Sequence, residues 1–154
     1  MLKIIDADIL KAPENIIVHQ VNCQGVMGSG LALQIRNKYP IVYKNYKSVV
    51  ESASPLSNLL GQVIFEEVGE KKVVASMFAQ EFFGPGVQTD YTYLEQCLLT
   101  VMGFAIKNNY SIAIPHKLGC GLAGGNWISV YKIVERLFDN CPVYIYRWHP
   151  EKGS

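Results

Sequence analysis

The chain lacks the features that mark several large classes of protein. None of its 154 residues belongs to an apolar run that approaches the roughly 20 residues needed for a membrane-spanning helix. The first six residues have neither the long apolar core nor the small-residue cleavage site of a secretory signal. We therefore expect no association with a membrane and no secretion.

An excess of charge of one sign is also missing. The 14 basic and 13 acidic residues give a formal net charge of +1. So neutral a total predicts no broad electrostatic surface for nucleic acid or for an anionic membrane. A short basic strip remains compatible with it.

Cysteine and histidine are few and widely spaced. No Cys-x-x-Cys pair occurs, and the three histidines have no metal-like spacing, so we expect no zinc ribbon, no metal site and no bound cofactor. Because hydrophobic residues make up 49% of the chain, a core can form without disulfides. This usage favours a reducing, cytoplasmic compartment. The four cysteines are Cys23, Cys97, Cys120 and Cys141.

Short apolar runs alternate with segments of helical periodicity. The pattern predicts an α/β fold with a mostly parallel sheet, made mixed by a hairpin turn at 69–71. We expect one domain over 1–148 and a polar tail over 149–154. Strands are expected at 2–5, 16–21, 62–68, 72–78, 111–114 and 143–146. Helices are expected at about 31–39, ended by Pro40, then at 42–50, after a cap at Thr89 or Asp90, and after an N-cap at Asn126.

Two glycine-rich loops follow predicted buried strands. The first spans residues 22–30 and the second 119–125, and neither matches the dinucleotide fingerprint or the Walker loop. Either loop alone is compatible with a tight strand-to-helix turn. Parallel strands end at one edge of a sheet, so the two loops together predict two anion sites. A ligand with a diphosphate, or with a phosphate at each end, fits this arrangement.

Other residues allow both a structural and a functional interpretation. Asp8 is either a cap or a carboxylate that accepts a hydrogen bond from a base amine. His19 lies inside an apolar strand and is predicted to be a core histidine. His116, beside the second glycine loop, is either a proton-transfer group or a rim residue. Cys23 and Cys120 are expected to be small residues near a ligand rather than nucleophiles.

Aromatic residues occur at two further places where a ligand would be expected. Phe82 and Phe83 lie in an unusually apolar loop over 80–90, and Tyr146 and Trp148 lie at the end of the last strand. Such rings either stack on a base or ribose or fill the core.

Three groups of residues, taken in order, resemble the macro domain family. They are Ala7-Asp8-Ile9, then Val21-Asn22 with residues 27–32, then Ile114-Pro115 with residues 119–127. The resemblance covers nearly the whole chain. It looks closest to the small branch that includes ADP-ribose-1″-phosphate phosphatases and terminal ADP-ribose–glutamate hydrolases. It implies a three-layer α/β/α fold that binds ADP-ribose.

The resemblance also implies roles for individual residues. Asp8 would hold the adenine amine with help from the Ile9 backbone, and Tyr146 would lie beside the adenine. The first loop would line the distal ribose and one phosphate, and the second would wrap the diphosphate from the other side. The implied ligand-binding residues are Asp8, Ile9, Val21, Asn22, Gly28, Ser29, Gly30, Leu31, Gly119, Cys120, Gly121, Leu122, Ala123, Gly124 and Tyr146.

Two positions depart from the glutamate-hydrolase pattern. Those hydrolases use a lysine in or after the strand that here spans 73–80, and an aspartate where this chain has Ala123. No lysine follows Lys72 in that strand, so a covalent lysine mechanism is not expected. The chain therefore resembles the phosphatase branch or a binder without catalysis.

The first functional hypothesis is a hydrolase that acts on an ADP-ribose derivative, with ADP-ribose-1″-phosphate as substrate. Asn22, Gln80 and His116 are the expected catalytic residues, which would orient the ribose, position water or move a proton. The alternatives are a non-catalytic reader of ADP-ribose and an ADP-ribosyl hydrolase acting on protein or nucleic acid. The expected partner is ADP-ribose or a derivative, and an ADP-ribosylated protein is a further one.

Overall fold

A six-stranded mixed sheet forms the centre of the molecule. The computed structural model describes residues 2–148, so the predicted polar tail over 149–154 lies outside the described residues. The strand order is β1-β6-β5-β2-β4-β3, and every neighbouring pair is parallel except β3 and β4. The predicted mixed, mostly parallel sheet is confirmed. The strands are β1 (Lys3–Ile5), β2 (Ile16–Val21), β3 (Val63–Gly69), β4 (Lys72–Phe78), β5 (Ile112–Pro115) and β6 (Val143–Tyr146).

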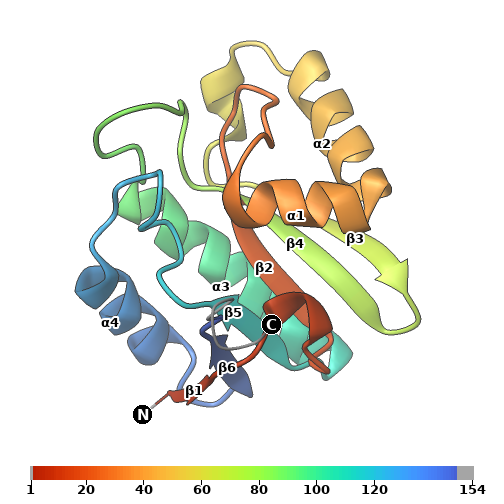
Figure 1. Cartoon of the computed structure of the whole chain (residues 1–154), viewed down its shortest axis with the longest axis vertical. Helices are drawn as coiled ribbons and strands as arrows, with labels where there is room; N and C mark the ends of the chain where they lie inside the picture. Colours follow the sequence, from red (N-terminus) through yellow and green to blue (C-terminus); the bar gives the residue numbers. More distant parts are fainter. Residues whose placement is uncertain (1, 149–154) are drawn as a thin grey trace.

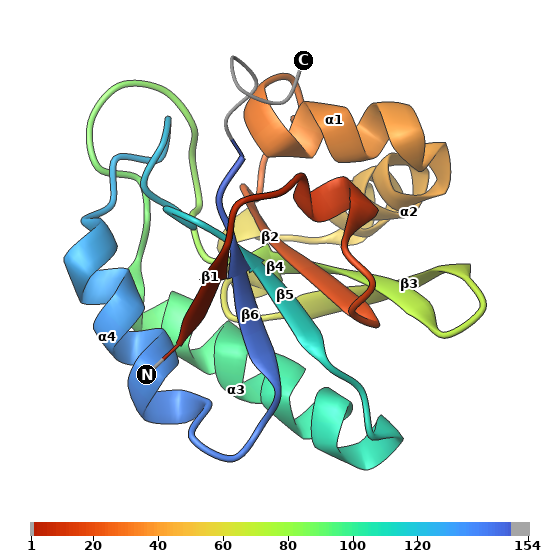
Figure 2. The same cartoon turned by 60° about the horizontal axis from the view of Figure 1, so that its bottom comes forward.

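Helices cover both faces of this sheet. Figure 2 shows α3 and α4 on one face and α1 and α2 on the other, which confirms the three-layer α/β/α architecture. Two short 3-10 turns complete the fold: η1 lies between β1 and β2, and η2 lies between α2 and β3. The helices are α1 (Gly30–Lys38), α2 (Pro40–Ser52), α3 (Tyr91–Asn108) and α4 (Trp127–Leu137), and the turns are η1 (Ile9–Lys11) and η2 (Leu56–Leu59).

Most predicted element boundaries hold, and two details differ. Asp90 caps α3 and Asn126 caps α4, as predicted, each accepting a hydrogen bond from a backbone N–H of the first turn. Pro40 separates two helices, but it does so as the first residue of α2, where its missing N–H costs nothing. Residues 56–59, for which no element is predicted from the sequence, form η2, which buries Leu59.

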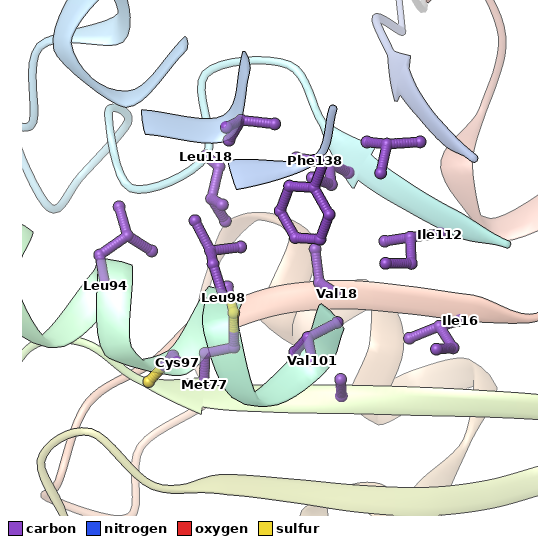
Figure 3. Packing of buried hydrophobic residues seen from close by; sticks show 14 of the residues in the cluster. Ile16, Val18, Met77, Leu94, Cys97, Leu98, Val101, Ile112, Leu118 and Phe138 are labelled. Carbon is purple, nitrogen blue, oxygen red and sulfur yellow. The ribbon is translucent and has the colours of Figure 1, made fainter. Parts of the chain in front are cut away.

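The core consists of two layers separated by the strands. On β2, Ile16 and Val18 face α3 and α4, and Figure 3 shows them packed with Leu98 and Val101 of α3. On the other face, Tyr46 of α2 joins a second buried cluster beneath α1 and α2. Burial on both faces explains why β2 is an almost continuous apolar run.

The parallel strands place three loops at one edge of the sheet. Residues 22–29 follow β2, residues 79–90 follow β4, and residues 116–126 follow β5. Figure 1 shows these loops gathered at one end of the molecule, with α1 and α2 on one side and α3 and α4 on the other. Because β2 pairs with both β4 and β5, these three loops are neighbours.

No helix within residues 2–148 has the length and apolar character needed to cross a membrane. The cytoplasmic location inferred from cysteine usage and the domain limits of 1–148 stay predictions.

Replacing Leu98 by alanine is expected to destabilise the fold, because this side chain is fully buried between α3 and the sheet. We expect a loss of about 2–5 kcal/mol in the free energy of unfolding, measured by urea denaturation. The neighbouring Leu99 is 45% exposed and provides the matched control. Leu99→Ala is expected to change stability by less than about 0.5 kcal/mol. Equal losses for the two variants would contradict the packing.

Candidate ligand-binding site

A buried hydroxyl organises the first glycine loop. The Tyr46 hydroxyl lies 2.7 Å from the carbonyl oxygen and 2.8 Å from the Oδ1 of Asn22, and it accepts a hydrogen bond of 3.1 Å from the Gly25 N–H. The Asn22 side chain also donates to the carbonyl oxygen of Val26 and accepts from the N–H of Gln24. The loop conformation therefore depends on one asparagine and on one tyrosine from α2.

The second glycine loop is held by the loop that follows β4. The carbonyl oxygen of Ala123 accepts hydrogen bonds from the N–H groups of Gln88 and Thr89, at 2.7 and 3.2 Å. The Thr89 hydroxyl donates to the carbonyl oxygen of Gly119 at 2.6 Å. Gly124 has a φ of +73°, and a Cβ there would lie 2.7 Å from the carbonyl oxygen of Gly86. This close approach requires glycine.

A pair of glutamine side chains links the strands to these loops. Gln20 of β2 donates through its Nε2 to the Oε1 of Gln80, at 2.9 Å, and to the Thr89 hydroxyl, at 2.8 Å. Gln80 in turn donates to the carbonyl oxygen of Phe82. The amide of Gln80 is thereby fixed at the carboxyl end of β4. The Oε1 of Gln20 is buried without a hydrogen-bond partner among the described residues.

A cavity of about 650 Å³ lies between the two glycine loops. Its walls come from β2, the start of α1 and all three loops at this edge. Within the residues that line it, Lys117 is the one with a charged side chain at neutral pH, and no carboxylate is among them. The residues predicted for ligand binding or catalysis that line this cavity are Val21, Asn22, Gly28, Ser29, Gly30, Leu31, Gln80, His116, Gly119, Gly121, Leu122 and Ala123.

A smaller cavity of about 430 Å³ continues the first one toward β1 and β6. Leu31, His116 and Lys117 line both cavities, together with Pro115, so the two form one continuous depression. Of the predicted residues, it is lined by Asp8, Ile9, Leu31, His116 and Tyr146.

Asp8 and Tyr146 are fixed by their own hydrogen bonds in the smaller cavity. The Asp8 Oδ1 accepts from the N–H of Leu10 at 3.0 Å, so the predicted capping role is confirmed. The Tyr146 hydroxyl donates to the buried carboxylate of Glu14. Burial and this carboxylate raise the pKa of Tyr146, so the phenol stays protonated. The roles predicted for both residues toward adenine stay predictions.

Two buried titratable groups, His19 in the wall of the larger cavity and Cys23 in the first glycine loop, favour their neutral forms. His19 is buried, as predicted, and its Nε2 lies 2.7 Å from the Ser76 hydroxyl. Burial lowers the pKa of His19 to about 3, so the imidazole is neutral at physiological pH. Burial raises the pKa of Cys23 to about 11, and the negative charge of Glu81 makes a smaller contribution in the same direction. The thiol therefore stays protonated. The expectation that Cys23 is not a nucleophile agrees with this shift.

Two predicted residues do not line either cavity. Cys120 and Gly124 belong to the second loop and are not among the residues that line the two cavities. The catalytic roles predicted for Asn22, Gln80 and His116 stay predictions, although the structure brings all three to the larger cavity.

The sequence did not point to several residues that the structure places at the site. His19 and Gln20 line the larger cavity, although they belong to a strand whose apolar pattern predicts a core position. Tyr46 looks like an ordinary core residue in the helical pattern, and no sequence signal distinguishes it. Gln20 has one signal in the sequence: it is a polar residue within an apolar strand that ends at a glycine loop. Such a position indicates a side chain near the ligand.

The comparisons with known proteins define the class to which this site belongs. The model of the Macro domain family matches residues 18–134, and the chain belongs to this family. The resemblance carried by the two glycine loops is thereby confirmed.

Two curated relatives carry enzyme names. A DNA ADP-ribosyl glycohydrolase of Mycobacterium tuberculosis is 26% identical over 140 residues, which are 88% of this chain and 38% of the relative. An ADP-ribose 1″-phosphate phosphatase of Saccharomyces cerevisiae is 34% identical over 76 residues, which are 48% of this chain and 42% of the relative. The matched residues thus span less than half the length of each enzyme.

Solved structures support the same fold. A protein from Bacteroides thetaiotaomicron superposes with a TM-score of 0.86 at 27% identity, over 96% of this chain and 98% of its own. DarTG of Thermosipho africanus, solved in complex with ADP-ribose, superposes with a TM-score of 0.79 at 22% identity, over 98% of this chain and 42% of its own.

Gly121→Glu is expected to abolish binding of ADP-ribose. A Cβ at Gly121 meets no atom within 4 Å, so the change adds a carboxylate to the cavity wall without a backbone clash. Repulsion between that carboxylate and a bound diphosphate should weaken affinity at least roughly tenfold, measured by calorimetric titration. Gly121→Ala is the control and should bind like the wild type. Retained affinity in Gly121→Glu would show that the second loop does not hold the diphosphate.

The free energy of unfolding is expected to fall as the pH is lowered from 7 toward 4. Between pH 6.5 and about 3 the unfolded chain binds a proton at His19 that the folded chain does not, because burial keeps this imidazole neutral. His19→Gln should show a shallower fall over this pH range, measured by urea denaturation at a series of pH values. Identical pH profiles for the two proteins would contradict the buried neutral state.

Proposed function

We propose that this chain binds ADP-ribose and hydrolyses an ADP-ribose derivative at the anomeric end of its distal ribose. The observation that carries the proposal is the single depression with two glycine loops at one end and Asp8 and Tyr146 at the other. A diphosphate between two sugars matches this order of subsites, because backbone N–H groups suit the anion and a carboxylate with an aromatic ring suits a base.

The electrostatics of the larger cavity agree with an anionic ligand. Its lining contributes Lys117 and no carboxylate, so a bound diphosphate meets no negative side chain there. Glycine loops place backbone N–H groups at a short distance from such a ligand at little steric cost. An additional phosphate on the distal ribose is compatible with the same walls.

ADP-ribose-1″-phosphate is the first substrate that we propose. Hydrolysis of this ester adds water across the phosphorus–oxygen bond and releases ADP-ribose and inorganic phosphate. Gln80, whose amide is fixed by Gln20, would orient the attacking water. His116 would transfer the proton to the leaving oxygen, and Asn22 would hold the ribose. The relatives named ADP-ribose 1″-phosphate phosphatase support this substrate.

Removal of ADP-ribose from a nucleic acid is the second candidate. It is favoured by the length of the match to the DNA ADP-ribosyl glycohydrolases, which extends over 88% of this chain. In that reaction water would add at the anomeric carbon, and the bond between that carbon and the nucleic acid would break. The open mouth of the cavity would leave room for an attached strand. The match to the named phosphatase covers 48% of the chain.

The two candidates differ in the substrate that is consumed and in the product released beside ADP-ribose, so one assay separates them. The protein is incubated with ADP-ribose-1″-phosphate, an ADP-ribosylated oligonucleotide and an ADP-ribosylated peptide, and products are separated by chromatography. We expect ADP-ribose from at least one of the first two substrates. Gln80→Ala should lower kcat at least roughly tenfold on the same substrate, since the water would lose its orienting amide.

Binding of free ADP-ribose is measured alongside by calorimetry. Binding without turnover of any substrate would make the chain a reader of ADP-ribose. Absence of binding would overturn the proposal as a whole.

A further inference from the structure

A long stretch of this nearly neutral chain contains no acidic residue. Residues 15–50 include four of the 14 basic residues and none of the 13 acidic ones, so the rest of the chain is net negative. This stretch forms β2, the first glycine loop, α1 and most of α2. The basic residues are Arg36, Lys38, Lys44 and Lys47. All four therefore belong to the two helices on one side of the cavity (Figure 1).

Two of these cations lie over one aromatic ring, and a third is exposed on the same helix. The Arg36 guanidinium lies 3.7 Å from the centre of the Tyr43 ring, and the Lys47 Nζ lies 6.0 Å from the same centre. Lys44 and Lys47 are exposed and lie about 60° apart around α2. We refer to Arg36, Tyr43, Lys44 and Lys47 as the α1–α2 cluster. Its stacked guanidinium is preorganised, which reduces the entropy lost when it binds a phosphate.

The acidic residue that contacts α2 lies on a different side of this helix. Asn45 donates a hydrogen bond to the carboxylate of Glu66 on β3. Asn45 is two residues from both Lys47 and Tyr43, so helical geometry places it about 160° from each of them around the helix axis. Lys38 also points elsewhere, because its ammonium donates to the carbonyl oxygen of Leu10. Within α2 itself, Glu51 follows Lys47 by four residues, about one helical turn away. The three cations of the α1–α2 cluster and this one carboxylate leave a net charge of +2 on this surface.

The cluster adjoins the mouth of the ligand cavity. The Tyr43 hydroxyl lies 3.5 Å from the carbonyl oxygen of Gly25 in the first glycine loop. In the same loop, the N–H of Cys23 donates a hydrogen bond to the carbonyl oxygen of Glu81. Directly after Glu81, the loop exposes Phe82 and Phe83 to 53% and 56%. A chain of contacts thus leads from the cluster through the first glycine loop to the segment that exposes the two rings.

We propose that the α1–α2 cluster binds the sugar–phosphate backbone of a single-stranded nucleic acid, with bases stacking on Phe82 and Phe83. Regularly spaced phosphates fit a row of cations, and exposed rings accept unpaired bases of any sequence. An acidic peptide would use the cations and would leave the two rings exposed. Binding of the strand does not depend on the proposed hydrolysis. Where both hold, the cluster selects an ADP-ribosylated strand over free ADP-ribose-1″-phosphate.

The test is binding of a fluorescent 12-residue single-stranded DNA of mixed sequence, followed by anisotropy at several salt concentrations. Three phosphate contacts predict a slope of about −2 in log K against log salt. Lys44→Ala/Lys47→Ala should weaken binding roughly fivefold or more and flatten the slope by about 1.4. The matched control, Lys107→Ala/Lys132→Ala, removes the same charge from exposed sites on α3 and α4 and should bind like the wild type.

A second variant addresses the rings. Phe82→Ser/Phe83→Ser should weaken binding without changing the salt slope, because it removes stacking and no charge. Thermal unfolding verifies that each variant is folded, and calorimetry with ADP-ribose reports on the cavity separately. An undetectable complex at low salt, equal losses in cluster and control variants, or a poly-glutamate peptide that binds as tightly as the DNA would overturn the proposal. Retained DNA binding in a protein that turns over no substrate would refute the proposed hydrolysis alone.

Discussion

The ligand cavity depends on the buried hydroxyl of Tyr46. This one group contacts both oxygens of Asn22 and receives the N–H of Gly25. A buried hydroxyl that both donates and accepts a hydrogen bond is favourable, whereas the same groups left unpaired would each cost about 1–3 kcal/mol. The first glycine loop, which would surround a phosphate, is therefore positioned by α2, a helix of the outer layer. The glycines of this loop allow its backbone conformation, and the hydrogen bonds of Tyr46 stabilise that conformation over others.

The cavity is assembled from walls of different origin. The first glycine loop is fixed from α2, and the second is fixed from the segment that leads into α3 through Gln88 and Thr89. Gln20 lies between them and contacts the segment from the strand side. Such a site uses backbone N–H groups and a nearly uncharged lining to receive an anion, so that its affinity depends on geometry more than on countercharge.

Much of this fold could be predicted from local pattern. The apolar runs identify the strands. Asp90 and Asn126 identify two helix starts, because their side chains accept hydrogen bonds from backbone N–H groups of the first turn. The glycine loops could be placed at one edge because parallel strands end together. These features follow from sequence neighbours or from a general rule of topology.

The missing parts are contacts between residues far apart in the chain. Gln20 is 60 residues from Gln80 and 69 residues from Thr89 along the chain. Tyr46 belongs to α2, whereas its partner Asn22 belongs to the first glycine loop. A helical pattern records that Tyr46 is on the buried face and does not record what its hydroxyl meets. The near-zero net charge likewise conceals the α1–α2 cluster, because charges cancel in a sum and do not cancel across opposite surfaces.

The way the two glycine loops are anchored links ligand occupancy to the mechanical integrity of the domain. One loop is attached to the helical layer of α1 and α2, and the other to the layer of α3 and α4, with the sheet between them. A molecule that contacts both loops acts as a cross-link between the outer layers, at the edge where the sheet itself no longer joins them. Its binding free energy is then shared by the whole domain, and the occupied protein resists local opening of either layer.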